Sequence, residues 1–235
     1  MARDDIGAAD PGHYGNGGNR AGQRTDRIDA AHSAGIGGKE AGNMSKLHFH
    51  YGVMSAGKST QLIQAHYNFT NNDVHCLAVK PIIDSRVSES KIVSRIGIEC
   101  PAVPMDKLRV RNIIKKYDAS VILIDEVQFF DSKSIDCLVD LADSYGKIVM
   151  CYGLMIDSNG QMFDAAKRLL ESGATLHKLR TSCEINRCMN LATHHLRFDI
   201  NGQVIRKGQQ ICVGDSNYKS VCRPHFYEYY KGKGK

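Results

Sequence analysis

The chain has 235 residues, of which 42% are hydrophobic and 24% charged, and it carries a net charge of +6. No run approaches the roughly 18 apolar residues of a membrane span, and the start lacks the apolar stretch of a secretory signal. The charge suits anionic ligands but is too mild to indicate nucleic acid. We therefore expect a cytoplasmic protein with reduced thiols and no membrane partner, built from one or two domains.

The first 43 residues differ from the rest of the chain. Glycine, Asp, Asn, Arg and Ala dominate there, and apolar residues show no periodicity. Such a segment cannot bury enough surface to offset its ordering entropy. Its six acidic residues argue against a transit peptide. We expect residues 1–43 to be a disordered, dispensable leader, either a tag or an over-extended reading frame, with Met44 as the working start.

A glycine-rich loop comes next, between a predicted strand at Leu47–Tyr51 and a predicted helix at Ser59–Asn71. Strand, loop and helix in this order are the context of a Walker A phosphate loop. Lys58 would neutralise the β- and γ-phosphates of ATP, and Ser59 would offer its hydroxyl to Mg²⁺. The alternative is a glycine turn that binds nothing. The loop consists of Gly52, Val53, Met54, Ser55, Ala56, Gly57, Lys58, Ser59 and Thr60.

A second half of the same site is predicted further along the chain. The apolar, β-branched run Ser120–Ile124 ends in Asp125 and Glu126. A continuous apolar run is typical of a strand buried on both faces of a parallel sheet, and ligands bind at the C-terminal ends of such strands. Asp125 is therefore interpreted as the Walker B carboxylate that holds Mg²⁺. Glu126 would be free to take a proton from an attacking hydroxyl or water. The alternative is an ordinary pair of solvated acids at a strand end.

From Met44 onward, strands and helices alternate as in an α/β domain. We predict a phosphate-loop domain with a parallel, RecA-like sheet over residues 44–180. A polar stretch between Pro81 and Pro101 is interpreted as a mobile lid ending near Ser94–Gly97. Further strands are predicted at Val74–Val79, Val121–Asp125 and Lys147–Tyr152, and further helices at Met105–Tyr117, Ser132–Ser144 and Phe163–Glu171.

The sequence changes character after about residue 180, where cysteines, short β-like runs and turns predominate. We predict a small second domain at 181–230, followed by a basic tail at 231–235. Two ligand pairs, C-x4-C and C-x2-H, flank a segment with predicted β-structure, as in a closed structural zinc site. Cys212 is a spare candidate, and buried free thiols beside a surface histidine are the alternative. The predicted ligands are Cys183, Cys188, Cys222 and His225.

These motifs together resemble those of cytosolic, type II thymidine kinases of the bacterial kind. The resemblance covers the chain from Met44 to about Tyr230. It implies a lasso loop, around residues 199–217, that closes over the nucleoside and holds thymine by backbone hydrogen bonds. The motifs that carry it are G-V-M-S-A-G-K-S-T, Asp84-Ser85-Arg86, Ser94-Arg95-Ile96-Gly97, Asp125-Glu126-Val127-Gln128-Phe129-Phe130, Cys151-Tyr152-Gly153-Leu154 and Tyr218-x3-Cys222-Arg223-Pro224-His225.

The resemblance also implies roles for particular residues. Glu126 is similar to the general base that deprotonates the nucleoside 5′-hydroxyl, and Arg86 to a lid arginine at that hydroxyl or the transferring phosphoryl group. Gln128 is expected at the nucleotide. Phe129 is expected to stack on the base. The walls of the thymine pocket would be Met54, Phe129, Leu154 and Phe163, and Tyr218 matches a tyrosine of the lasso loop that contacts the substrate.

The function implied by the resemblance is transfer of the ATP γ-phosphate to thymidine, and also to deoxyuridine, with Mg²⁺ as cofactor. Members of this family are typically homotetramers with one structural zinc per chain. The competing hypothesis is a RecA-like ATPase module whose zinc ribbon binds nucleic acid. It would share the phosphate motifs, with Glu126 activating water, but the chain lacks a basic stripe with interleaved aromatic residues.

Overall fold

The computed structural model describes residues 46–83, 90–105, 116–206 and 217–232. All of them belong to one compact unit, Gly42–Lys235. The predicted leader, 1–43, lies outside the described residues, as do most of the predicted helix Met105–Tyr117 and the last residues of the basic tail. The separation of a second domain after residue 180 stays a prediction.

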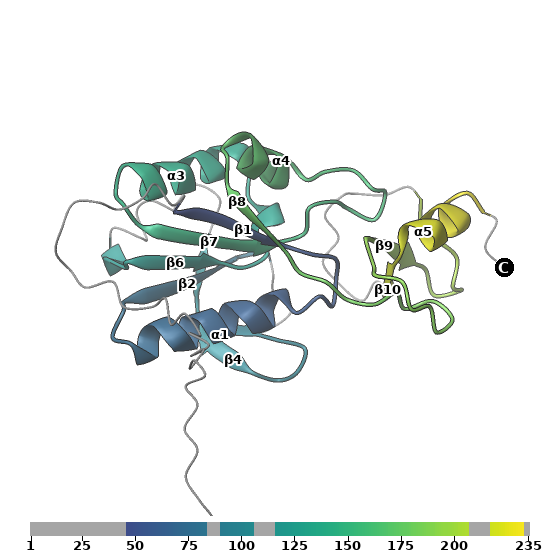
Figure 1. The fold of residues 1–235 in the computed structure, drawn as a ribbon, viewed down its shortest axis with the longest axis horizontal. Coiled ribbons are helices and arrows are strands. Elements are labelled where there is room, and N and C mark those ends of the chain that lie inside the picture. The colour runs from purple at the N-terminus through teal and green to yellow at the C-terminus, as the bar shows by residue number, and fades with distance from the viewer. Residues whose placement is uncertain (1–45, 84–89, 106–115, 207–216, 233–235) are drawn as a thin grey trace, which may run out of the picture. The chain divides into compact units, whose positions relative to one another are not determined.

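A six-stranded parallel sheet forms the centre of this unit (Figure 1), which confirms the predicted α/β class. The strand order is β5-β2-β6-β7-β1-β8. Consecutive strands are joined through helices or longer segments, as parallel pairing requires. The strands are β1 (Leu47–Tyr51), β2 (Cys76–Pro81), β5 (Val103–Met105), β6 (Val121–Ile124), β7 (Ile148–Gly153) and β8 (Thr175–Lys178).

Helices cover both faces of the sheet. Helix α1 (Lys58–Asn71) lies on one face, and α3 (Ser132–Asp143) and α4 (Asp164–Glu171) lie on the other (Figure 1). Helix α3 begins where the Asp131 carboxylate accepts a hydrogen bond of 2.9 Å from the Ser134 backbone N–H, a standard N-cap. The predicted helices are therefore confirmed within one residue at each end for these three segments.

Alternating side chains of the buried strand β6 build two cores. Ile122 and Ile124 pack with residues of α3 and α4, such as Leu138 and Leu169. Val121 and Leu123 pack with Leu62 and Ile63 of α1 on the opposite face. All four β6 residues are buried, as expected for a continuous apolar run in a sheet covered on both faces. This strand fixes where Asp125 and Glu126 leave the sheet.

The polar stretch expected to be a mobile lid is partly a hairpin. Strands β3 (Lys91–Val93) and β4 (Glu99–Pro101) pair antiparallel. Ile92 and Cys100 are buried in the core on the α1 side. Two apolar side chains thus attach this half of the stretch to α1, and the interpretation as a mobile lid stays a prediction. Residues 84–89 lie outside the described part.

The edge strand β8 was not predicted. It pairs parallel with β1 over four residues, His48 to Tyr51. Its own side chains are largely exposed, so it lacks the apolar run by which buried strands are found. Strand β2 also differs: it runs from Cys76 to Pro81, shifted two residues toward the C-terminus from the predicted Val74–Val79.

The C-terminal part contains a hairpin and a short helix. Strands β9 (His194–Phe198) and β10 (Asn217–Val221) pair antiparallel, and α5 (Arg223–Tyr230) follows. They share a small apolar core that includes Leu196, Val221 and Phe226. Residues 207–216, the central part of the expected lasso, lie outside the described residues.

Candidate active site and metal cluster

The phosphate loop joins the end of β1 to the start of α1, as the motif predicts. Gly57 is the residue before the helix and has φ 79°, a left-handed conformation that favours glycine. At Gly52 an added Cβ would lie 2.9 Å from the Ala56 Cβ and 3.0 Å from the Leu179 carbonyl oxygen. These two glycines are therefore required by the loop geometry itself.

Lys58 is buried although it carries a charge. Its Nζ donates to the Val53 carbonyl oxygen at 2.9 Å and lies 3.5 Å from that of Gly52. The ammonium group is thus held over its own loop, beside the backbone N–H groups at the start of α1. This arrangement concentrates positive charge where a phosphate is expected to bind.

Ser59 and Asp125 meet at the C-terminal end of the sheet. The Ser59 hydroxyl donates to the Asp125 carboxylate, with Oγ to Oδ2 at 3.1 Å. Asp125 is buried, and burial, with the nearby Glu126 carboxylate, raises the pKa of Asp125 to about 7. A hydroxyl and a carboxylate side by side form the kind of oxygen donor set that Mg²⁺ prefers. A divalent cation there would favour the ionised form of Asp125.

The Glu126 backbone is in the left-handed region. Its φ is 46°, which is uncommon for a residue with a side chain and is found most often at functional sites. The Gln128 amide donates to the Glu126 Oε2 at 2.5 Å, and its Oε1 accepts from the Leu154 backbone N–H at 2.9 Å. Gln128 therefore connects the carboxylate to the loop after β7.

This positioning contact of Gln128 was not predicted. Its expected contact with the nucleotide stays a prediction. Gly153 makes the contact possible, since an added Cβ would lie 2.5 Å from the Gln128 Oε1 and 2.7 Å from the Val127 Cγ1. A glycine directly before Leu154 in an otherwise apolar strand is the sequence signal that marks such a close approach.

The residues expected around thymine differ in accessibility. Phe129 and Tyr218 are partly exposed. Leu154 packs against the main core, and Phe163 is buried in that core, so little of the Phe163 ring is accessible to a ligand. The Tyr218 ring lies 6.0 Å from the His195 ring in an edge-on arrangement. Arg86 lies outside the described residues.

A cavity of about 190 Å³ lies beside the first residues of the phosphate loop. Its volume is that of several water molecules. His195 lines it, is buried, and has an Nδ1 without a hydrogen-bond partner. Burial, with Lys58 and His194 nearby, lowers the pKa of His195 to about 3, so the imidazole is neutral. The other lining residues are Tyr51, Gly52, Val53, Met155, Ile156, Lys178, Leu179, Ala192 and Thr193.

His195 was not singled out from the sequence. In β9 both His195 and its neighbour Leu196 are buried, so the strand does not alternate between buried and exposed positions. A histidine in such a run gives no periodic signal that it lines a cavity.

The four predicted zinc ligands come together. Their ligand atoms all lie within 4.8 Å of one another. The Cys188 and Cys222 sulfurs are 3.9 Å apart, and the His225 Nδ1 lies 3.3 Å from the Cys183 sulfur and 3.4 Å from that of Cys222. In a tetrahedral zinc site with bonds of about 2.3 Å to sulfur and 2.0–2.1 Å to nitrogen, these separations are roughly 3.8 and 3.6 Å. The cluster therefore fits zinc.

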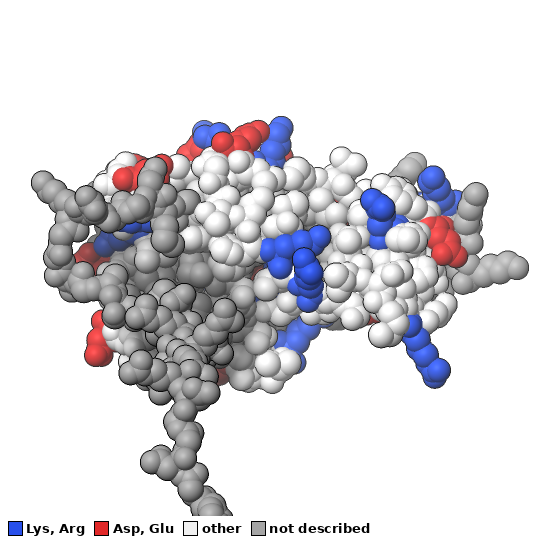
Figure 2. Space-filling model, in the orientation of Figure 1, with Lys and Arg blue, Asp and Glu red and all other residues white. Residues whose placement is uncertain are grey.

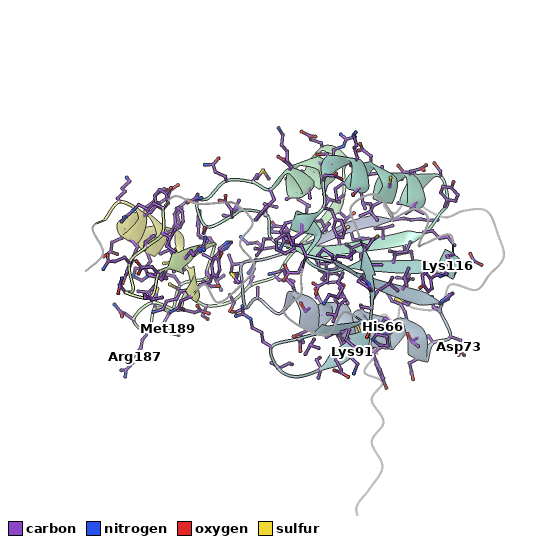
Figure 3. All side chains as sticks on the ribbon, turned by 180° about the vertical axis from the view of Figure 1, so that it is seen from behind. His66, Asp73, Lys91, Lys116, Arg187 and Met189 are labelled. Carbon is purple, nitrogen blue, oxygen red and sulfur yellow. The ribbon has the colours of Figure 1, made fainter. Side chains whose placement is uncertain are left out.

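The wide C-x4-C spacing is explained by a tight turn. The Cys188 N–H donates to the Ile185 carbonyl oxygen at 2.8 Å, and the two residues between them, Asn186 and Arg187, have φ of 44° and 55°. Two successive left-handed residues form a type I′ turn, which returns Cys188 to Cys183. Arg187 points away from this turn (Figure 3). Cys212 lies outside the described residues.

Comparison with known proteins decides the family. A family model described as thymidine kinase matches residues 45–226. The chain belongs to the thymidine kinase family. This match covers the phosphate loop, Asp125, Glu126 and all four predicted zinc ligands, so the family resemblance seen in the motifs is confirmed.

Bacterial relatives align with most of the chain. A thymidine kinase of Rhodopirellula baltica is 39% identical over 191 residues, 79% of this chain and 89% of the relative. Thymidine kinases of Shewanella oneidensis and Haemophilus influenzae are each 36% identical, again over 79% of this chain and over 98% and 97% of their own length. Across the described parts of the chain, no helix is long and apolar enough to cross a membrane.

Proposed function

We propose that this chain is a thymidine kinase that transfers the γ-phosphoryl group of ATP to the 5′-hydroxyl of thymidine, giving dTMP and ADP. The observation that carries the proposal is the meeting of three elements at one edge of the sheet. These are the phosphate loop with Lys58, the Ser59–Asp125 pair at 3.1 Å, and Glu126 held by Gln128. Family membership, and relatives named thymidine kinase, support thymidine as the acceptor.

The proposed reaction is an in-line displacement. The thymidine 5′-oxygen bonds to the γ-phosphorus, and the bond from that phosphorus to the ADP oxygen breaks with its electron pair going to ADP. The hydroxyl proton passes to the Glu126 carboxylate. Gln128 donates to Oε2 of this carboxylate and so helps to hold it in position. Lys58 and the loop N–H groups orient and neutralise the phosphates.

Mg²⁺ would be held by Ser59 and Asp125, and when bound it neutralises charge shared by the β- and γ-phosphates. We also propose one structural zinc per chain at Cys183, Cys188, Cys222 and His225. All four positions are taken by protein ligands, so the cluster has no open position for catalysis. A homotetrameric assembly and a cytoplasmic location are proposed from the family resemblance.

One assay tests the proposed function. ADP release is coupled to a spectroscopic readout with thymidine, deoxyuridine, deoxycytidine or no nucleoside. We expect release with the first two and little with the others. Release that is independent of nucleoside and stimulated by DNA would instead favour the ATPase module. Among the described residues no contact favours that module. On the face shown in Figure 2, Lys and Arg stand in separate groups and do not form the continuous basic stripe typical of nucleic-acid binding.

A further inference from the structure

Arg95, an arginine outside the Asp84–Arg86 motif, contacts the phosphate loop. Arg95 lies in the turn between β3 and β4, and its Nη1 donates to the Ser55 hydroxyl. Ser55 is in the middle of the loop and has φ 60°. Both side chains are solvent-exposed. A ligand that enters the loop would therefore meet the guanidinium group without displacing any buried side chain.

The hairpin that carries Arg95 is attached to the helix that the loop begins. Ile92 and Cys100, on its two strands, are buried in the core that also contains Leu62 and Ile63 of α1. Within the turn, the Ser94 N–H donates to the Ile98 carbonyl oxygen at 2.9 Å. The backbone at Arg95 is thus fixed relative to the phosphate loop before any ligand binds, which reduces the entropy cost of a contact.

In the part of the chain that the structure describes, no neighbour neutralises the charge of Arg95. Within residues 46–83, 90–105, 116–206 and 217–232, its single hydrogen-bond partner is the neutral Ser55 hydroxyl, and no carboxylate pairs with it. A guanidinium group presents several N–H donors in a planar fork that matches phosphate oxygens. Lys58, the other cation of the loop, is occupied by backbone carbonyls on the inner side. Arg95 therefore adds an exposed cation to the buried one at the loop.

We propose that Arg95 is a catalytic arginine of the phosphoryl transfer. Its N–H groups exchange the Ser55 hydroxyl for non-bridging oxygens of the γ-phosphoryl group. There they stabilise the charge that develops while the bond to the 5′-oxygen forms and the bond to ADP breaks. Arg95 remains protonated throughout, since the hydroxyl proton goes to Glu126. The inference rests on the proposed function and adds to it a charged group supplied within the chain.

The experiment compares Arg95→Ala and Arg95→Lys with the matched variant Lys91→Gln. Lys91 lies at the start of the same hairpin, next to α1 (Figure 3), and its exposed ammonium pairs with Glu99. Lys91→Gln removes the same unit of charge from the same element without touching the loop. Each variant is measured for kcat, for the ATP dissociation constant by direct nucleotide binding, and for melting temperature.

Removing an arginine from the transferring phosphoryl group lowers kcat by about 10³–10⁵-fold in related chemistry. We expect at least a 10²-fold loss for Arg95→Ala, a smaller loss for Arg95→Lys, and an ATP dissociation constant within about threefold of wild type. Added guanidinium ion should restore part of the Arg95→Ala activity, which a purely structural role would not allow. Lys91→Gln should keep wild-type kcat.

The role of Arg95 is overturned if Arg95→Ala retains kcat within about threefold. It is equally overturned if kcat falls no further than in Lys91→Gln, or falls only together with the melting temperature and without guanidinium rescue. These outcomes are separate from failure of the proposed function, which would be wild-type enzyme that does not phosphorylate thymidine. Even then, the rate of ATP hydrolysis, in which water accepts the phosphoryl group, can be compared between wild type and Arg95→Ala. This comparison decides whether Arg95 acts on the γ-phosphoryl group.

Discussion

The Ser220 hydroxyl donates a 2.6 Å hydrogen bond to the carbonyl oxygen of Met54, joining β10 to the phosphate loop across 166 residues of sequence. Ser220 is buried, and its own N–H donates to the Glu184 carboxylate at 2.8 Å. Cys222, two residues further along, belongs to the metal cluster. The phosphate loop is therefore connected to the part of the chain that carries the proposed zinc ligands.

The first prediction concerns this bond. In Ser220→Ala the Met54 carbonyl group loses its partner, and leaving such a group unsatisfied costs about 1–3 kcal/mol. We expect weaker ATP binding and a lower melting temperature. Ser172→Ala is the matched control, because the Ser172 hydroxyl also donates to a backbone carbonyl, that of Arg168 at 2.8 Å, but at the end of α4. Equal ATP affinity in the two variants would show that the Ser220 bond does not support the loop.

The metal cluster gives the second prediction. Purified protein should contain one zinc per chain by elemental analysis, and Cys188→Ser should lose it. Because the free energy of metal binding contributes to folding, that variant should also melt at a lower temperature and, through Ser220, bind ATP more weakly. Cys137→Ser, which changes a partly buried cysteine of α3, should keep the zinc. Full zinc content in Cys188→Ser would remove Cys188 from the ligand set.

The third prediction separates the general base from the residue that positions it. Glu126→Gln should lower kcat by about 10²–10⁴-fold, the usual contribution of a general base, with ATP binding nearly intact. Gln128→Ala should lower kcat by less, about tenfold, because the carboxylate remains but loses its 2.5 Å partner. Steady-state measurement of kcat in both variants distinguishes the two roles. Near wild-type turnover in Glu126→Gln would exclude this residue from the mechanism.

Sequence reasoning found the groups that carry the chemistry but not the contacts that hold them. Lys58, Ser59 and Asp125 could be placed because the phosphate loop and the buried run before Asp125 are local patterns with a fixed structural setting. The four metal ligands could be paired because two close spacings limit the possible partners. Long-range contacts such as Ser220 to Met54 or Arg95 to Ser55 have no local signal. They depend on how the β3–β4 and β9–β10 hairpins pack against the rest of the fold, which is determined by tertiary contacts.

The elements at the edges of the fold could also not be predicted from local sequence patterns. Strand β8 and the β3–β4 hairpin are short and carry polar or charged residues, so their hydrophobic periodicity is weak. They form because β1 offers an unpaired edge and α1 an apolar surface. The strand β6, buried on both faces, was placed within one residue.

The last prediction concerns pH and three histidines on β1 and β8. The His50 ring stacks on those of Tyr152 and His177, at centroid distances of 4.5 and 4.3 Å. The His48 Nδ1 lies 3.2 Å from the His177 Nε2. The His50 Nε2 is buried without a hydrogen-bond partner, and burial, with His177 and then His48 nearby, lowers the pKa of His50 to about 4 despite the Gln61 hydrogen bond.

Between pH 6.5 and about 4 the unfolded chain therefore binds a proton at His50 that the folded chain does not. The free energy of unfolding should rise with pH across this window and fall as the solution is acidified. Urea unfolding at pH 7 and pH 5 measures the difference. His50→Gln should reduce that pH dependence even where its stability at pH 7 is lower, whereas the exposed His75→Gln should leave it unchanged. An identical pH dependence in wild type and His50→Gln would show that the stacked histidines do not govern the response to acid.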